Sequence, residues 1–588
     1  MSLLNKASLI QIPSGYKDGT LYSAKPTNGD GDFTFSRGSN LAATRVNSDG
    51  LIEKGRENLL LQSNQFDTTW GTYDTSVTSG QSGYDGSSDA WLLDITGATG
   101  FQTLRQTISN SGAQTFSVYA KAGTLNWIRF TFAGGTGPTI YFDLQNGTLG
   151  SVGGGVSKIE DVGNGWYRCS SFFSGSFTEL RIYPATANNN PVQSSGNIYI
   201  QHAQLEAGLV STPYIETGAT TAQAGILEDM PRLDYSGGAT CPSLLLEPQR
   251  SNLILDSEYF SSSTWQGTTG AVLTENDTTS PEGVQNATKI EGDGAASFIR
   301  LYDFQNFASA GDYSFSFFAK AGNANFIEVS LLGYDGGGAA NFDLLNGTID
   351  DVANGSIEDY GNGWYRCTCI KSIGATDLNG SANLYIRKSL TENWDNAAEA
   401  NGKYVYIYGA MLEEGSYPTS YIPTYGSSVT RSSDALETSP YDYQSQGVLG
   451  ANVGTIILDC ETIGTSTGSN DFHMFGEAKS IADGYLFRAN TGTTIDILER
   501  DSNSTSAQWT GIAVKQTRNK IAVSYSGSDV DVYANGVAKS LSSGTPVGGG
   551  NINGFANSTS NSAGLIIHQI LLFPNKLTND ELADLTTL

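Results

Sequence analysis

Tryptophan side chains are the residues of this chain best suited to bind a ligand, because a broad aromatic face can stack on a sugar ring. The chain contains 8 of them. Three of them lie at positions that differ between two similar parts of the chain, and a fourth lies beside Ser506 and Gln508. Variable loops on a constant scaffold often carry binding sites. The candidate glycan-binding residues are Trp91, Trp127, Trp394 and Trp509. The competing interpretation is that each ring seals one end of a folded domain.

Catalytic chemistry has much weaker support. Glu206 and Glu413 close matching stretches in separate parts of the chain, whereas hydrolysis of a glycosidic bond needs two carboxyl groups within one site. The histidines have no partner at metal-ligand spacing, and no nucleophile or phosphate-loop motif is present. The sequence therefore predicts no catalytic residue, no cofactor and no enzymatic activity. Acidic clusters such as Asp350-Asp351 or Asp501 could bind Ca²⁺, but none has the spacing of a calcium loop, so no metal ligand is assigned.

A long domain is present twice. The first copy contains Asn58–Leu61, Ala120–Gly123, Phe142–Thr148, Gly163–Cys169 and Leu205-Glu206, and the second repeats them in order at Asn252–Leu255, Ala319–Gly322, Phe342–Thr348, Gly361–Cys367 and Leu412-Glu413. Such ordered similarity indicates a duplicated whole domain rather than a short solenoid repeat. Trp166 and Trp364 keep the same neighbours in both copies, so we expect them in the core. Two copies of one module favour multivalent binding.

Composition narrows the class of protein. The chain has 588 residues and a net charge of −27, which disfavours nucleic acid and anionic membrane surfaces as partners. Its 70 glycines and its scarcity of helical periodicity are typical of short strands joined by tight turns. No apolar stretch is long enough for a membrane helix. The chain has 5 cysteines. Cys169 and Cys367 are equivalent in the two copies, but Cys369 has Ser171 as its counterpart. A disulfide framework would keep its pairs in both copies, so the cysteines are expected to be reduced.

Hairpin signals divide the chain into β domains. Asn-Gly, the strongest short hairpin signal, occurs at 146–147, 346–347, 164–165, 362–363 and 535–536. Many short strands without intervening helices predict sandwiches or jelly rolls. Near the end, Thr578 and Glu581 have the spacing of a helix capping box. The predicted units are an N-terminal attachment segment (1–54), a first sandwich (55–217), a connector (218–249), a second sandwich (250–425), a connector (426–446) and a lectin-like domain (447–588).

These motifs resemble known families. Gly-Asn-Gly-Trp-Tyr-Arg, the closing Gln204-Leu205-Glu206 or Met411-Leu412-Glu413, and the phrases Ser420–Thr424, Pro231–Tyr235 and Cys241–Arg250 resemble the carbohydrate-binding-module-like jelly rolls of tailed-bacteriophage structural proteins. The Tyr-x-Asn-Gly turn at 533–536 and the final Leu-Thr-x-x-Glu-Leu resemble a laminin-G or concanavalin-A-like lectin domain. The resemblance implies an all-β fold of tandem jelly-roll sandwiches with a C-terminal concanavalin-A-like sandwich. It assigns no ligand residue.

From these observations we expect a phage fibre or spike-type virion protein, made in the bacterial cytoplasm, that displays lectin-like domains for adhesion to host-surface glycans. Other virion proteins would hold it through the N-terminal segment, and the resemblance implies a homotrimer. We expect neither nucleic acid binding nor membrane insertion. The alternative is a structural head or tail decoration or adaptor protein whose sandwiches contact other proteins. A polysaccharide depolymerase is the third possibility, and it requires a carboxylate pair in one groove.

Overall fold

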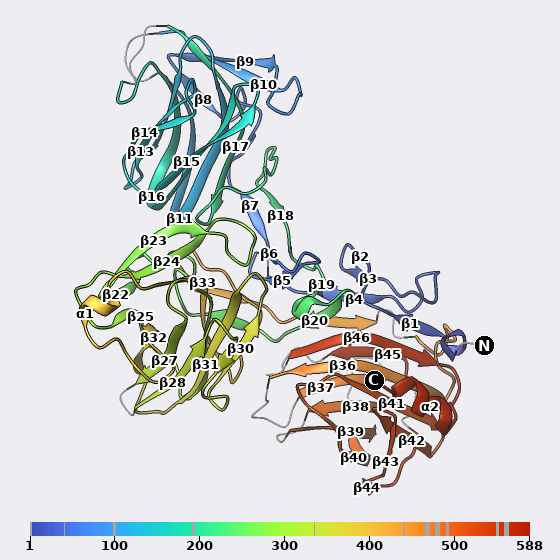
Figure 1. The fold of residues 1–588 in the computed structure, drawn as a ribbon. Coiled ribbons are helices and arrows are strands. Elements are labelled where there is room, and N and C mark those ends of the chain that lie inside the picture. The colour runs from blue at the N-terminus through green and yellow to red at the C-terminus, as the bar shows by residue number, and fades with distance from the viewer. Residues whose placement is uncertain are drawn as a thin grey trace.

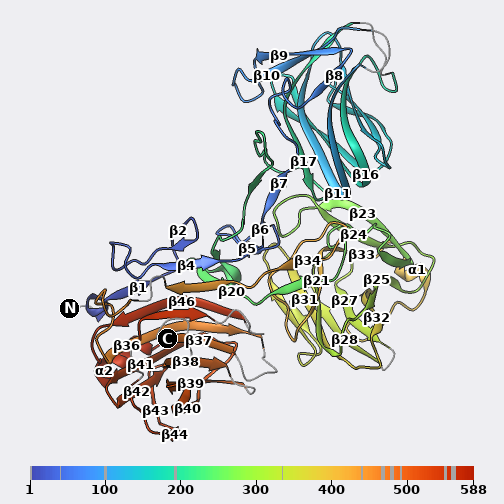
Figure 2. The same cartoon turned by 180° about the vertical axis from the view of Figure 1, so that it is seen from behind.

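The computed structural model shows three β-sandwich lobes. It describes residues 3–39, 41–97, 102–190, 195–333, 336–438, 442–464, 471–476, 483–489, 493–548, 552–557 and 564–588. In Figure 1 the first copy of the repeat (repeat one) lies at the top, the second copy (repeat two) at the lower left and a third sandwich at the lower right. The view from behind in Figure 2 shows the same arrangement. The structure confirms the predicted fold class of tandem sandwiches with a C-terminal concanavalin-A-like sandwich.

Repeat one is built around two long strands that run through both layers of the sandwich. Its strands, in sheet order, are β14 (Thr148–Val152), β13 (Thr139–Asp143), β12 (Trp127–Ala133), β16 (Trp166–Ala185), β11 (Thr103–Ala122), β17 (Asn197–Ala207), β10 (Ala90–Ile95) and β9 (Thr75–Gln81), with β15 (Val156–Gly163) on β16 and β8 (Gly71–Tyr73) on β11. All these pairings are antiparallel.

In repeat two the long strands are broken, so its two layers are separate sheets. One sheet has the order β22 (Trp265–Thr269), β25 (Ile299–Asn306), β32 (Asn379–Arg387), β27 (Phe326–Gly333), β28 (Gly336–Asp343) and β29 (Thr348–Ile349). The other has the order β23 (Ala271–Thr278), β24 (Ala287–Gly292), β33 (Tyr404–Glu414), β26 (Gly311–Ala321), β31 (Trp364–Ile373) and β30 (Gly355–Asp359), and the short helix α1 (Ala397–Ala400) precedes β33.

The third sandwich takes strands from both ends of the chain and from its connectors. One sheet has the order β19 (Arg232–Asp234), β20 (Ser243–Leu246), β46 (Gly564–Phe573), β36 (Val453–Ile463), β41 (Asn519–Ser526), β42 (Asp529–Ala534) and β43 (Val537–Lys539), with β1 (Leu9–Gln11) also on β46. The other has the order β2 (Tyr16–Lys17), β3 (Thr20–Leu21), β4 (Phe33–Ser36), β35 (Ala435–Thr438), β45 (Gly554–Asn557), β37 (Asp471–Gly476), β38 (Gly484–Ala489), β39 (Thr494–Asp501), β40 (Ser504–Val514) and β44 (Ser543–Gly544).

This assembly corrects the expectation of a separate N-terminal attachment segment. Leu9 pairs with Leu572, and Phe33 pairs with Thr438. Leu9, Leu21 and Phe33 are fully buried in the core of the third sandwich. The first strands pack there because their alternating apolar side chains complete a core that residues 447–588 alone would leave open. The closing helix α2 (Asn579–Thr586) begins with the predicted capping box between Thr578 and Glu581.

Short paired strands link the lobes. They are β7 (Arg56–Asn58) with β18 (Ala222–Ala224), β21 (Arg250–Asn252) with β34 (Val429–Arg431), and the hairpin β5 (Thr44–Val46) with β6 (Ile52–Lys54). In Figures 1 and 2, β7 and β18 lie between repeat one and the other two lobes. Two 3₁₀ turns are also described, at Leu3–Lys6 and Ser236–Gly238. Among the described helices, none is long and apolar enough to cross a bilayer.

A buried ion network holds the connectors together. This connector network consists of Arg37, Arg232, Glu247, Arg431 and Asp434, whose side chains are almost completely buried. Arg232 pairs with both Asp434 and Glu247, and its contact with Glu247 is 2.6 Å long. Arg431 lies 2.9 Å from Glu247, and Arg37 lies 3.3 Å from Asp434. The network therefore joins the N-terminal segment to both connectors.

The connector network predicts a loss of stability in acid. Burial raises the pKa of Glu247, but Arg431 and Arg232 outweigh it and hold the pKa well below the ordinary 4.5. In the unfolded chain the carboxylate takes up a proton near pH 4.5, so below that pH the unfolded state binds more protons and unfolding becomes easier. We expect the midpoint of urea unfolding to fall as the pH drops from 4.5 towards about 3. The Glu247→Gln variant should be less stable at neutral pH and should show a shallower acid slope. An unchanged slope would contradict this role.

Candidate functional site

The structure places the four predicted tryptophans in different environments. Trp91 is only 6% exposed, packs in the core of repeat one and donates its indole N–H to the Asn64 carbonyl over 2.9 Å. Trp509 is 2% exposed in the core of the third sandwich. Burial corrects the expectation for these two residues, because a sugar ring cannot reach their faces. The constant Trp166 and Trp364 are buried, as predicted.

Trp127 and Trp394 are half-buried and are not brought together. Trp127 begins β12 of repeat one and packs against the Gly150 backbone, where an added Cβ would lie 2.6 Å from the ring. Trp394 lies on the core of repeat two, with the Lys403 ammonium 5.6 Å from its ring centre. Its indole N–H has no acceptor among the described groups. Each ring keeps part of one face accessible, so both remain proposed ligand contacts.

The equivalent carboxylates Glu206 and Glu413 each stabilise a turn. Glu206 accepts hydrogen bonds from the backbone and hydroxyl of Thr212, and Glu413 does the same with Thr419. Asp350 accepts from the backbone and side chain of Asn341, so both of its oxygens already bond to protein. These acidic groups stabilise the local backbone.

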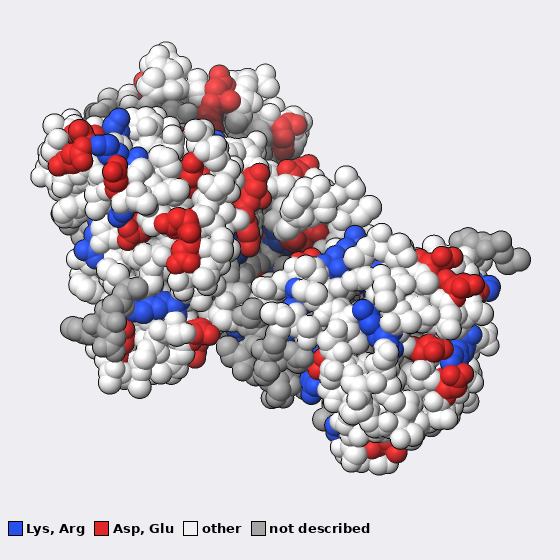
Figure 3. Space-filling view, turned by 60° about the horizontal axis from the view of Figure 1, so that its bottom comes forward, with Lys and Arg blue, Asp and Glu red and all other residues white. Residues whose placement is uncertain are grey.

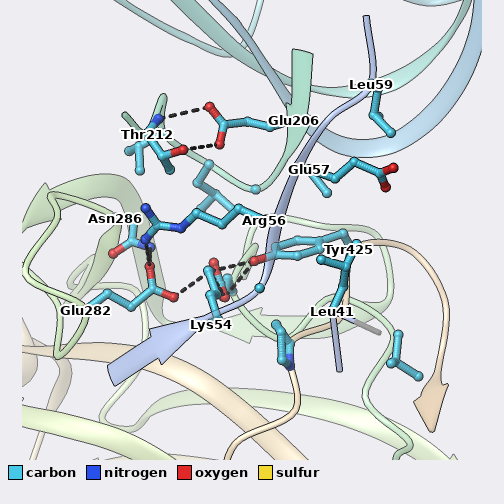
Figure 4. Close-up of a pocket in the computed structure, with 18 residues that line it drawn as sticks. Leu41, Lys54, Arg56, Glu57, Leu59, Glu206, Thr212, Glu282, Asn286 and Tyr425 are labelled. Carbon is cyan, nitrogen blue, oxygen red and sulfur yellow. Dashed lines mark hydrogen bonds and ion pairs between the residues drawn. The ribbon is translucent and has the colours of Figure 1, made fainter. Parts of the chain in front are cut away.

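One end of repeat two contains a buried lysine from a distant segment. We call this site the lysine pocket, and Figure 4 shows it. The Lys54 ammonium at the end of β6 lies 2.7 Å from Glu258, 2.5 Å from Glu282 and 2.7 Å from the Tyr425 hydroxyl. Arg56 extends beside it, 3.7 Å from Glu282. A cavity of about 220 Å³ remains between these side chains and the Glu206–Thr212 turn of repeat one.

The lysine pocket keeps its ammonium charged. Burial lowers the pKa of Lys54, but Glu258 and Glu282 outweigh that effect and raise it. Tyr408 and Tyr421 each donate a hydroxyl proton to Glu258 over 3.1 Å. Two carboxylates with fixed phenol groups around them form a specific binding site for a primary ammonium group.

The equivalent end of repeat one is open, and we call it end site one. Asp85 and Asp89 are exposed and lie about the buried Gln201. The Gln201 amide donates to Asp89 over 2.6 Å and to Asp85 over 3.4 Å. The Ser87 hydroxyl lies within hydrogen-bonding distance of both carboxylates and can donate its one proton to either. Asn64 completes the polar group by donating to Asp89 over 3.0 Å.

Stacked rings form the walls of end site one. Tyr84 stacks on Tyr119 with ring centres 3.9 Å apart, and His202 stacks on Tyr214 at 4.0 Å. His202 has a φ of 53°, a left-handed conformation that Gly409 adopts at the same strand irregularity in repeat two. Strained backbone in a non-glycine residue is typical of functional sites. Burial lowers the pKa of His202 against the opposing effect of Asp89, so its ring is neutral at neutral pH.

End site one also has the donor set for a metal ion. Asp85, Asp89 and His202 place their potential ligand atoms within 4.8 Å of one another. Two exposed aspartates beside one histidine are common in proteins that bind no ion there, so we assign no metal.

A second surface, on the outer face of repeat two, was missed by sequence reasoning. We call it the aromatic face, and it comprises Arg300, Tyr302, Phe304 and Tyr385. Phe304 is 60% exposed and meets Tyr302 edge-on, with ring centres 5.1 Å apart. The Arg300 guanidinium lies 3.9 Å from the Tyr302 ring centre and 5.4 Å from that of Tyr385. The sequence signal was the alternation Arg-x-Tyr-x-Phe along β25, which places all three side chains on one side of the strand.

The aromatic face borders a hollow whose lining includes amide and hydroxyl side chains as well as apolar surface. A cavity of about 340 Å³ beside Phe304 is lined by Gln305, Asn306, Leu332, Asn379, Gly380 and Ser381. Arg300 donates to the buried Asn383, which in turn donates to Ser381. In the register of repeat one, Thr103, Arg105 and Thr107 occupy the positions of Arg300, Tyr302 and Phe304. The two copies have therefore diverged on this face.

Comparisons with known proteins give no family for the chain. No protein-family model and no curated protein matches it. The similar solved structures include the N-terminal tandem CBM22 domains of Paenibacillus barcinonensis Xyn10C, with 10% identity, a TM-score of 0.20, and coverage of 64% of this chain and all of that one. The LG1-3 region of the laminin alpha2 chain matches with 10% identity and a TM-score of 0.10, covering 81% of this chain and 92% of that one. Likenesses of this size say nothing about ligands.

The prediction that the chain is not an enzyme is contradicted and is not retained. A sialidase from Trypanosoma rangeli, solved with the inhibitor DANA, matches with 9% identity and a TM-score of 0.20, over 98% of this chain and 92% of that one. From the sequence we also expected no two carboxylates to share a site. Glu258 and Glu282 both contact Lys54, and Asp85 and Asp89 both accept from Gln201. The sialidase likeness is too small to assign an activity.

Proposed function

We propose that this protein is an adhesion component, a fibre or spike-type protein of a tailed-bacteriophage virion, that attaches to glycans on the host surface. The observation that carries the proposal is the aromatic face. Phe304 and Tyr302 present exposed rings for stacking, and the cavity beside them offers amide and hydroxyl groups for hydrogen bonding. Apolar platforms with a few placed polar groups are the usual form of a small-molecule site.

The arrangement of the lobes suits weak, repeated contacts. Repeat two carries the aromatic face, and Trp127 of repeat one and Trp394 of repeat two offer further partly exposed rings. Linked sites raise overall avidity by roughly 10²–10⁴ when they can engage together. Assembly as a homotrimer, and attachment to other virion proteins through the lobe that contains the N-terminal strands, belong to the same proposal.

The surface charge agrees with neutral or cationic partners. On the face shown in Figure 3, acidic side chains are spread over the surface with basic ones among them. With a net charge of −27, long-range attraction to polyanions such as nucleic acid is disfavoured. Neutral glycans, which are recognised by stacking and hydrogen bonds, carry no such penalty.

Replacing Phe304 by alanine should weaken glycan binding. A glycan array probed with the full chain would first identify a bound sugar, and surface plasmon resonance would then compare variants. We expect Phe304→Ala to lower affinity about tenfold or more, because stacking aromatics are typical hot spots. Its stability should hardly change, since the ring is mostly exposed.

The matched control is Leu345→Ala, which removes an exposed apolar side chain from a hairpin of the same repeat. Equal binding by Phe304→Ala and the original chain would overturn the assignment of the aromatic face. Failure of the full chain to bind any bacterial surface glycan, together with capture of virion proteins, would favour the adaptor alternative.

A further inference from the structure

The lysine pocket shows how this type of sandwich receives a lysine. The hairpin β5–β6 lies against the 279–286 loop of repeat two, where Ile52 donates its N–H to the Pro281 carbonyl over 2.9 Å. The Leu51 side chain covers Gly283, at whose position a Cβ would lie 2.7 Å from it. A short extended segment thus anchors by backbone and apolar contact and inserts Lys54 between two carboxylates (Figure 4).

End site one is the positional equivalent of that receptor. Asp89 and Asn286 each precede the alanine that opens a matching strand, and Asp85 and Glu282 each precede a glycine of positive φ. Likewise, Asn64 and Glu258 each follow a serine whose hydroxyl lies 2.6 Å from the hydroxyl of a matching tyrosine.

The chemistry is retained although individual residues are exchanged. Repeat two has carboxylates at 258 and 282 and an amide at 286. Repeat one has an amide at 64 and carboxylates at 85 and 89. Each end therefore presents two carboxylates and one asparagine around the same point. This exchange keeps the charge of the receptor while changing the geometry of its entrance.

End site one contains no lysine of its own. The His202 ring lies 3.7 Å from the Asp89 carboxylate, and the Asp89 side chain is 50% exposed. Gly218 follows Thr217 at the position where Tyr425 follows Thr424 in repeat two, and a Cβ added to Gly218 would meet nothing within 4 Å. Repeat one therefore has no equivalent of the Tyr425 ring and has aspartates in place of glutamates, whereas Tyr84 and His202 stand where repeat two has Pro281 and Gly409.

We infer that end site one binds a lysine side chain presented on a short extended segment of another polypeptide, in the way that repeat two binds β6. The ammonium would lie between Asp85 and Asp89 beside the Tyr84 and Tyr214 rings. Apolar residues of the segment would cover the 82–89 loop, as Leu51 covers its counterpart. This makes the first lobe a docking point for a protein partner, independent of the proposed glycan contacts on repeat two.

The test uses the full chain and a peptide with the sequence of residues 50–57, Gly-Leu-Ile-Glu-Lys-Gly-Arg-Glu, with blocked termini and a fluorescent label. We expect saturable binding by fluorescence anisotropy that weakens with added salt. Changing the peptide lysine to glutamine should lower affinity about tenfold or more, because a charge-assisted contact is lost. The Asp85→Asn, Asp89→Asn double variant should lower it to a similar extent.

The matched control is the Glu160→Gln, Asp161→Asn double variant, which removes the same charge from β15 of the same repeat. It should bind the peptide as the original chain does. Binding that is absent, insensitive to the lysine change, or equally reduced by both double variants would overturn the inference. Glucosamine competing for this site more strongly than the peptide would also overturn it, since the receptor would then recognise an amino sugar. The Phe304→Ala chain should bind the peptide normally, which separates this result from the proposed glycan binding.

Discussion

Replacing Asp434 by alanine is expected to lower the free energy of unfolding of the third sandwich by about 3–5 kcal/mol, because one half of a buried charge network would be left without its partner. Asp434 pairs with Arg232 and Arg37, and all three side chains are fully buried. It also accepts the backbone N–H of Glu247 over 2.8 Å. Removing it leaves the Arg232 and Arg37 guanidinium groups buried without this shared carboxylate.

Hydrogen exchange followed by mass spectrometry would measure this effect, because it reports the local opening free energy of each lobe separately. We expect faster exchange at β20 and β35 and little change in repeat one. The control is Asp395→Ala, which removes an exposed partner of Lys388 and should leave all exchange rates as they were. Unaltered exchange at β20 in the Asp434→Ala chain would show that the connector network does not stabilise the junction.

Replacing Lys54 by methionine should destabilise the contact between the N-terminal segment and repeat two by about 3–5 kcal/mol. The substitution keeps much of the side-chain volume but leaves Glu258 and Glu282 buried without their cation. We expect hydrogen exchange to become faster in β5, β6 and the 279–286 loop. Lys388→Met is the matched control, since that lysine is exposed and pairs only with surface carboxylates.

A double-mutant comparison tests the cause of the Lys54 effect. Adding Glu258→Gln to Lys54→Met removes one of the stranded charges and should restore part of the lost stability. Additive losses would indicate that Lys54 acts through packing of its methylene groups rather than through its charge.

Hairpin chemistry explains how much of the fold the sequence could predict. At Asn164-Gly165, Asn362-Gly363 and Asn535-Gly536 both turn residues have positive φ, as the primed turn requires. At Asn146-Gly147 only the glycine does. There the Asp143 carboxylate accepts the N–H groups of Gln145 and Asn146, which makes a longer turn. The Asn-Gly pair thus predicts where a hairpin lies, but hydrogen bonds from a nearby side chain to the turn backbone determine the type of turn.

The domain boundaries depended on contacts that no local pattern contains. Residues 1–54 have too few apolar side chains for a core of their own, so their need for a partner was predictable. Their partner was not, because the pairing of Leu9 with Leu572 joins opposite ends of the sequence. Which strands pair at such a sheet edge depends on the burial of one strand face and on the geometry of the loops, and neither can be read from residues 1–54 alone.

Burial decides which of the predicted tryptophans a ligand could still reach. Trp91 and Trp509 fill sandwich cores, since a large ring at an inward strand position contributes much apolar burial. The aromatic face is formed by strand residues rather than loops, and only the sheet reveals that Phe304 has no covering layer. End site one needed the comparison of two folded copies, because its carboxylates occupy different positions in each.

The pairing of β1 with β46 also dictates an order of events on the ribosome. Repeats one and two are each continuous in sequence and can fold as they emerge. By contrast, β1 near residue 9 must wait for the last strand, β46, and β4 near residue 33 must wait for β35. During that interval the early strands expose unpaired edges, a state prone to association with other nascent chains. Chaperone dependence should therefore be concentrated in the first forty or so residues, and a chain truncated before β46 should aggregate even though both of its repeats are intact.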